Sequence, residues 1–224
     1  TGIGLAVYDM PSPDGAATGL AQRLTIDVAL RHAHSLYFLG RFQDSVEMVE
    51  PHLGRLARID DVGLTGSFMF WLAHMYSRLG DQGRATDAAH QAIEAATRAG
   101  DDATLGKAHG LLALEGHWSG DTVGGIAHGQ EAIHLLRAKV DQQWWLGMAH
   151  FYLAMNHGLA GDFDSALTEA GNAELVGTAL GDPRLHTYAG FTIGWLEASR
   201  GNHETATAAC RRRLSRRRSS GRTS

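Results

Sequence analysis

The chain has 224 residues, of which 44% are hydrophobic and 20% are charged, and its formal net charge is −4. These values suit a folded protein, and no run approaches the ~18 consecutive apolar residues that a membrane-spanning helix needs. A single cysteine, Cys210, excludes an internal disulfide and a cysteine-based zinc cluster. Because no signal peptide is recognisable either, we expect a cytoplasmic protein without a membrane partner.

Residues 1–16 are expected to form a linker that belongs to an upstream region. Pro11, Pro13 and Gly15 predict a loop in this segment. Gly2 and Gly4 are only a fragment of a phosphate-binding glycine loop, because no strand precedes them and no third glycine follows at the required spacing. We therefore predict no nucleotide site there.

From about residue 17 the chain shows helical periodicity, interrupted every 40 or 41 residues by a short turn. Each turn contains a glycine, which suits the left-handed residue that ends a helix, and in four of the five an Asp or Asn follows, which suits the N-cap of the next helix. The glycines are Gly40, Gly80, Gly120, Gly161 and Gly201. This period predicts helical hairpins, which we place at residues 18–58, 62–99, 103–138, 142–179 and 184–214.

Residues 211–224 interrupt the repeat with seven arginines and no acidic residue, which leaves 13 basic against 24 acidic residues in the body of the chain. We expect this tail to be disordered. Two interpretations remain open: an arm for nucleic acid or another anionic surface, or sequence unrelated to the repeat. The loss of the small-residue pattern at Arg213 favours the second, so nucleic-acid binding is expected only through the tail, if the tail is native.

Two columns of small residues accompany the turns. Seven residues before the glycines stand Ala33, Ala73, Ala113, Ala154 and Gly194. Five residues after them stand Ser45, Ala85, Gly125, Ala166 and Ala206. Small side chains at fixed positions let two antiparallel helices approach to about 8–10 Å. The columns therefore predict closely packed helix pairs.

This pattern resembles the tetratricopeptide repeat (TPR). The best match is Gly161-Asp162-Phe163 with Ala166 and Ala173. The period of about 40, against the usual 34, is similar to that of the long repeats in large bacterial signalling proteins. The resemblance implies an all-α fold, a right-handed α-α superhelix (a TPR-like solenoid) of about five hairpins over residues 17–210, C-terminal to an ATPase, cyclase or DNA-binding module.

The resemblance also implies that the first helix of each hairpin lines a concave groove. Counting back from the turn glycines gives a binding groove rich in aromatic and histidine side chains, formed by His34, Tyr37, Phe38, Phe70, His74, Arg78, His117, Trp118, Phe151, Met155, Phe191 and Trp195. Such side chains suit the binding of a protein or peptide. The competing interpretation is that many of these rings pack between neighbouring repeats. Three of the histidines, His34, His74 and His117, predict partner binding that changes near pH 6–7.

The sequence contains no Walker loop, no Gly-x-Ser-x-Gly elbow, no kinase signature and no His-Glu-x-x-His motif. We therefore predict that the chain is not an enzyme and has no catalytic residues, no cofactor and no metal site. The expected function is a protein–protein interaction scaffold, as the regulatory or sensor arm of a larger bacterial signal-transduction or transcription-regulatory protein. Two alternatives remain: a solenoid that senses a small-molecule effector, and a module that self-associates through uncapped ends.

Overall fold

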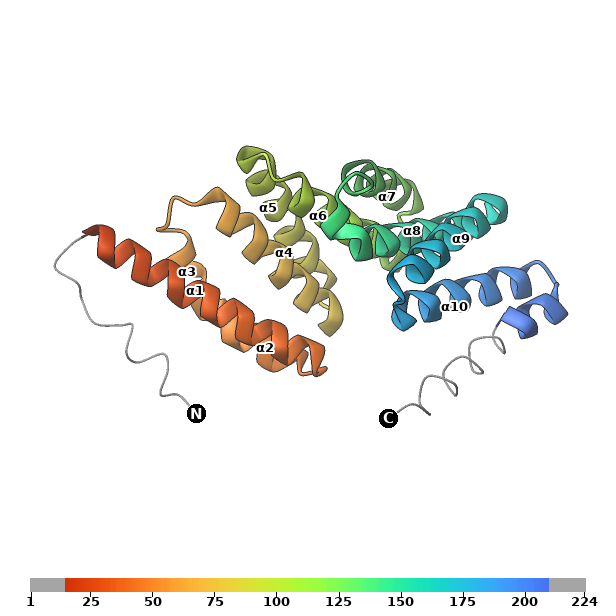
Figure 1. The fold of residues 1–224 in the computed structure, drawn as a ribbon, viewed down its shortest axis with the longest axis horizontal. Coiled ribbons are helices and arrows are strands. Elements are labelled where there is room, and N and C mark those ends of the chain that lie inside the picture. Colours follow the sequence, from red (N-terminus) through yellow and green to blue (C-terminus); the bar gives the residue numbers. More distant parts are fainter. Residues whose placement is uncertain (1–14, 210–224) are drawn as a thin grey trace. The chain divides into compact units, whose positions relative to one another are not determined.

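A computed structural model describes residues 15–209, and within that range every regular element is a helix (Figure 1). The predicted all-α class is therefore confirmed. Most of the predicted linker, Cys210 and the arginine-rich tail lie outside the described residues. Among the described residues, no helix combines the length and apolar character needed to cross a membrane.

Helix packing divides the chain into two units, with the boundary between Asp101 and Asp102. This boundary falls between the second and third predicted hairpins, residues 62–99 and 103–138, of the predicted solenoid over residues 17–210. Unit 1 contains α1 (Gly15–Phe38), α2 (Phe42–Val49), the 3-10 turn η2 (Glu50–His52), α3 (Leu53–Leu56), α4 (Val62–Leu79) and α5 (Gln82–Ala99). Unit 2 contains α6 (Asp102–Ser119), α7 (Thr122–Leu136), the 3-10 turn η3 (Val140–Gln142), α8 (Gln143–Leu159), α9 (Phe163–Leu180) and α10 (Pro183–Ser199).

The turns between paired helices have the predicted chemistry. The five turn glycines have φ values between 77° and 84°, in the left-handed region that favours glycine. Aspartates cap the helices that follow three of them: the side chains of Asp81, Asp121 and Asp162 accept hydrogen bonds from backbone N–H groups three residues later. Each turn thus ends one helix and starts the next within two or three residues, which brings the two helices together as an antiparallel pair.

The first hairpin departs from this regularity in its second helix, which is broken into α2, η2 and α3. Pro51 lies in η2 at the break. Proline has no N–H to donate and its ring clashes with the preceding turn, so a continuous helix is disfavoured there. His52 follows at a position where the later repeats have Ala92, Ala132 and Ala173, and its burial lowers the pKa of the imidazole.

The small-residue columns lie in the interfaces between helices, as predicted. Ala33, Ala73, Ala113 and Ala154 are completely buried, and so are most members of the second column. One close approach lies between α6 and α7, where a Cβ placed on Gly116 would lie 2.8 Å from the Cα of Gly125. At these positions the paired helices therefore approach closely.

Candidate functional site

Three predicted groove residues form a hydrogen-bonded chain that joins α1 to α4 in unit 1. The Nε of Arg78 donates to the hydroxyl of Tyr37 at 3.2 Å, and that hydroxyl lies 2.9 Å from Nδ1 of His74. The Tyr37 hydroxyl is therefore the common partner of Arg78 and His74. These hydrogen bonds fix the orientation of the Tyr37 ring.

Aromatic rings surround the hydrogen-bonded residues Tyr37, His74 and Arg78. The Trp71 ring lies at the centre, with centroid distances of 3.9 Å to His34, 5.3 Å to Phe70, 6.0 Å to Tyr37 and 6.5 Å to Phe38. Most of these pairs meet edge to face, which is a favourable arrangement of aromatic quadrupoles. We call the set the aromatic cluster, and it consists of His34, Tyr37, Phe38, Phe42, Phe70, Trp71, His74 and Arg78.

The aromatic cluster has a buried base and an exposed edge. Phe70 is completely buried, and Tyr37 and His74 are buried as well. Phe38 is 64% exposed and Arg78 is exposed too, while Trp71 lies between these extremes. Sequence spacing predicts that the groove residues of this cluster face a partner. The rings of the base are instead packed between helices, which is the competing interpretation for these rings. Only the exposed edge is accessible to a partner, and its role in binding stays a prediction.

The imidazole of His74 does not titrate near neutral pH. Burial, with the nearby positive charge of Arg78 as a smaller cause, lowers the pKa of His74 to about 4. Burial also lowers the pKa of His117. His74 therefore does not supply the predicted change of partner binding near pH 6–7, because a periodic pattern places a residue on a face without giving its depth. The pH dependence of binding itself stays a prediction.

In unit 2, two predicted groove residues on α8 are buried. Phe151 and Met155 are each 8% exposed. The Phe151 ring stacks on the ring of Tyr188 from α10, with centroids 5.1 Å apart and planes 20° from parallel. This pair packs one helix on the next, so the packing interpretation holds for Phe151.

Two other predicted groove residues of unit 2 are exposed. Trp118 at the end of α6 is 57% exposed, and Phe191 on α10 is 65% exposed. His117 and Trp195 are partly buried. The Trp195 ring lies against the backbone of Gly158 in α8, where a Cβ would come within 2.7 Å of Cζ3. Binding by any of these four residues stays a prediction.

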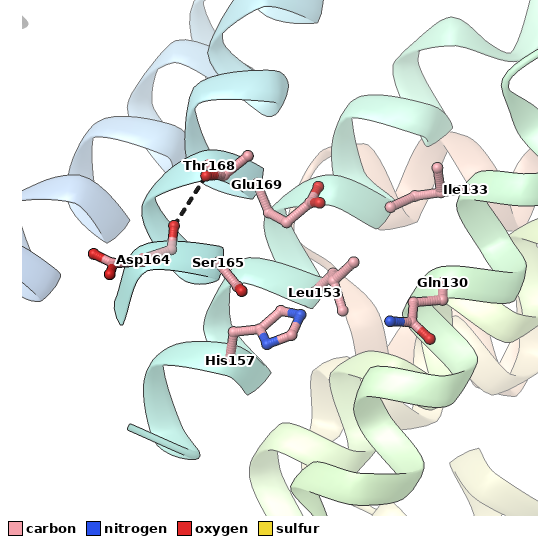
Figure 2. A pocket seen from close by; sticks show the side chains of 8 residues that line it. All are labelled: Gln130, Ile133, Leu153, His157, Asp164, Ser165, Thr168 and Glu169. Carbon is pink, nitrogen blue, oxygen red and sulfur yellow. Dashed lines mark hydrogen bonds between the residues drawn. The ribbon is translucent and has the colours of Figure 1, made fainter. Parts of the chain in front are cut away.

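A pocket of about 510 Å³ lies among α7, α8 and α9 in unit 2 (Figure 2). Two of these helices, α7 and α9, are the second helices of their hairpins, so the pocket is separate from the predicted groove of first helices. Figure 2 shows the side chains of α9 on one side, those of α7 on the other, and α8 between them. The lining residues are Gln130, Ile133, Leu153, His157, Asp164, Ser165, Thr168 and Glu169.

The Glu169 carboxylate is the best-fixed charge in this pocket. Nδ1 of His150 donates to its Oε2 at 2.5 Å, and Nδ2 of Asn172 donates to the same oxygen at 3.3 Å. The hydrogen bond from His150 lowers the pKa of the Glu169 carboxyl, so the group is ionised at neutral pH. In Figure 2 the carboxylate points into the space between α9 and α7.

The pair of His150 and Glu169 has a counterpart one repeat earlier. His109 of α6 and His128 of α7 stand 41 residues before them, and their Nδ1 atoms lie 2.9 Å apart. Both pairs bridge the two helices of a hairpin. Within residues 15–209, no group of three or more His, Cys, Asp or Glu side chains is arranged to hold a metal ion.

Sequence reasoning missed several residues of both sites. Trp71 is at the centre of the aromatic cluster but lies nine residues before its turn glycine, an offset that the groove pattern does not include. Phe42 belongs to a second helix, so it is outside the pattern as well. For the pocket, one sequence signal could have been used: His150 and Glu169 stand 41 residues after His109 and His128, so titratable residues recur at the same positions of two successive hairpins.

Comparisons with known proteins find solved structures of similar fold. At the level of sequence, neither a family model nor a curated protein matches the chain. Among solved structures, BtubC (BKLC) from P. vanneervenii is similar with a TM-score of 0.73 and 16% identity, over 92% of this chain and 84% of that one. The thermophilic TPR protein TTC0263 of Thermus thermophilus is similar with a TM-score of 0.62 and 18% identity, over 84% of this chain and 90% of that one.

A Rap protein complexed with Competence and Sporulation Factor is also similar, with a TM-score of 0.76 and 14% identity over 88% of this chain. The matched part is 54% of the Rap chain, so this chain spans about half of that protein's length. Identities at this level show the fold alone. The chain has a TPR-like all-α fold, as its turn glycines and small-residue columns predict.

Proposed function

We propose that the chain is a protein–protein interaction scaffold and that the exposed edge of the aromatic cluster binds a segment of a partner protein. The observation that carries this proposal is the side-by-side placement of Phe38, 64% exposed, and the half-buried Trp71 above a hydrogen-bonded base. Exposed aromatic residues are enriched among the side chains that dominate binding free energy at protein interfaces.

Rigidity of the base supports the same proposal. Tyr37 and His74 are buried and hydrogen-bonded to each other, so the rings that pack on them lose little freedom when a partner binds. Ordering a flexible side chain at an interface costs about 0.5–1.5 kcal/mol, and a preorganised ring avoids most of that cost. The partner chemistry that fits is a segment with a large apolar or aromatic side chain to cover Phe38 and Trp71.

The comparisons support the class of function. A TPR protein and a Rap protein in complex with Competence and Sporulation Factor have this fold, and binding modules of this kind act through their surfaces. We further infer that the chain is a regulatory or sensor arm of a larger bacterial signalling or transcription-regulatory protein in the cytoplasm. The chain matches 54% of the Rap protein and 58% of aspartyl phosphate phosphatase F from Bacillus subtilis, which supports a place within a longer chain.

A phage-displayed random peptide library tests the binding surface directly. Peptides are selected on the wild-type chain, and their affinities are then measured for Phe38→Ala, Trp71→Ala and Leu175→Ala. Leu175, on α9, is 68% exposed and is a matched control for removing an exposed apolar side chain. We expect both aromatic variants to weaken binding by roughly 10-fold or more, as interface anchors do, and the control by less than about 2-fold.

Two outcomes contradict this proposal. One is a selection that yields no peptide with saturable binding, and the other is a set of peptides whose affinity is the same for all three variants. Circular dichroism of each variant provides the folding control, because loss of helix in Trp71→Ala alone would leave Phe38→Ala, at an exposed position, as the deciding variant.

A further inference from the structure

The Glu169 carboxylate is held in one orientation, but only one of its two oxygens accepts hydrogen bonds from the protein. Its Oε2 receives both hydrogen bonds, from His150 at 2.5 Å and from Asn172 at 3.3 Å. Its Oε1 has no hydrogen-bond partner among residues 15–209, and the carboxylate points into the pocket in Figure 2. A fixed carboxylate with a spare oxygen is a preorganised acceptor for a donor brought by a ligand.

The rest of the lining favours a ligand that is cationic at one end and apolar along its length. No lysine or arginine is among the eight residues that line the pocket. Ser165 adds a hydroxyl on the α9 wall and Gln130 adds an amide on the α7 wall. Leu153 provides apolar surface between these walls, and Ile133 provides more on the α7 wall. Asp164 also carries a negative charge, although it is paired with Arg200 and its carboxylate points away from the centre of the pocket in Figure 2.

We propose that this pocket binds an organic cation, a primary ammonium group on an unbranched alkyl chain. The ammonium group has three N–H donors, one of which Oε1 of Glu169 can accept, and the hydroxyl of Ser165 on the same helix is a further acceptor in the lining. The alkyl chain covers Ile133 and Leu153. The volume of about 510 Å³ lies within the ~300–1,000 Å³ range of small-molecule sites.

A ligand of this chemistry has two sources, a free alkylamine and the lysine side chain of another protein. Isothermal titration calorimetry of the full chain with n-pentylamine and with Nα-acetyl-lysine N-methylamide distinguishes them. Tighter binding of pentylamine assigns the site to free amines, and tighter binding of the lysine derivative assigns it to protein lysines. n-Pentanol has the same chain without the charge, and we expect it to bind at least about 10-fold more weakly than pentylamine.

Two variants with the same change in net charge separate a specific site from general attraction. Glu169→Gln keeps the size of the side chain and an oxygen that can accept from His150, and we expect it to weaken amine binding by roughly 10- to 100-fold, the effect of a hydrogen bond to a charged group. Glu131→Gln removes a charge from an exposed position on α7 next to Gln130 but outside the lining. We expect this control to change binding by less than about 2-fold.

The proposal is overturned by any of three results: no saturable binding of either amine up to about 50 mM, equal binding of pentanol and pentylamine, or equal effects of the two variants. It uses only residues of unit 2. Failure here therefore leaves the proposed role of the aromatic cluster in unit 1 standing, and failure of that role leaves this site standing.

Discussion

At the scale of single residues, the buried imidazole of His74 makes stability depend on pH. Above pH 6.5 the ring is neutral in both the folded and the unfolded chain. Below that pH the unfolded chain takes up a proton, while the folded chain does not until the pH approaches the folded pKa of about 4. Stability therefore falls as the pH is lowered from 6.5 toward 4, and at about 1.4 kcal/mol per pH unit the loss from His74 reaches about 3 kcal/mol.

The variant His74→Gln tests this prediction, because glutamine is polar but does not titrate. We expect the variant to be less stable than the wild type at neutral pH and to show a shallower fall in the free energy of unfolding between pH 6.5 and pH 4. Urea unfolding at several pH values measures both quantities. Parallel pH profiles for the two proteins would mean that His74 has the same pKa in the folded and the unfolded chain, which would contradict the prediction.

The same residue shows how far a sequence pattern reaches. Helical spacing places His74 and Arg78, four residues apart on α4, on one face, and hydrogen bonds join both of them to Tyr37 of α1. Depth is a different quantity, set by the neighbours that cover a residue from other helices. Phe70 and Phe38 were predicted alike, yet Phe70 is completely buried and Phe38 is 64% exposed. The pattern therefore gives the face and leaves the accessible edge to the structure.

At the scale of helices, Gly125 shows that one small residue in the column is not equivalent to another. Other repeats have Ser45, Ala85 or Ala166 at this position. At Gly125, however, a Cβ would lie 2.1 Å from Oδ1 of Asn156. The Asn156 side chain is completely buried, and its Nδ2 donates to the carbonyl of Ala113 at 2.7 Å and to that of Tyr152 at 2.9 Å. A methyl group at residue 125 must displace this amide or separate the helices.

We expect Gly125→Ala to reduce the free energy of unfolding by about 2–4 kcal/mol, the combined cost of overpacking and of a buried polar group that loses its partners. Gly171→Ala is the matched control, because Gly171 lies inside α9 with nothing within 4 Å of a built Cβ. We expect the control to gain about 0.5–1 kcal/mol from the higher helix propensity of alanine. Denaturant unfolding compares the two, and a similar change in both variants would contradict the close contact at Asn156.

The turns and the pocket differ in how well sequence predicts them, for a reason of distance along the chain. A turn depends on neighbours, so Gly161 and Asp162 identify the end of α8 and the start of α9 from sequence alone. The pocket depends on side chains from three helices that are far apart in sequence, such as Gln130 and Glu169. The pocket volume is the space that those side chains do not fill, and a local sequence pattern does not predict that volume.

At the scale of the whole molecule, a repeat of nearly constant length folds into two compact units. The turn glycines recur with the same spacing on both sides of Asp101, so sequence predicts one continuous solenoid. Within this repeat the helix packing has a boundary, which lies between Asp101 and Asp102. In repeat proteins each hairpin is stabilised mainly by its neighbours, so a division in packing is also a division in how stability spreads along the chain.

Hydrogen exchange measured by mass spectrometry on the full chain tests that division. Gly125→Ala weakens unit 2, and we expect faster amide exchange in α6 to α9 with little change in α4 and α5. Gly66→Ala is the reciprocal variant, because a Cβ there would lie 3.2 Å from the backbone nitrogen of Ala96 between α4 and α5. It should accelerate exchange in those two helices and leave α8 and α9 unchanged. If either variant accelerates exchange uniformly from α4 to α9, the two units open as one, because a cooperative unit transmits a local loss of stability to all of its helices.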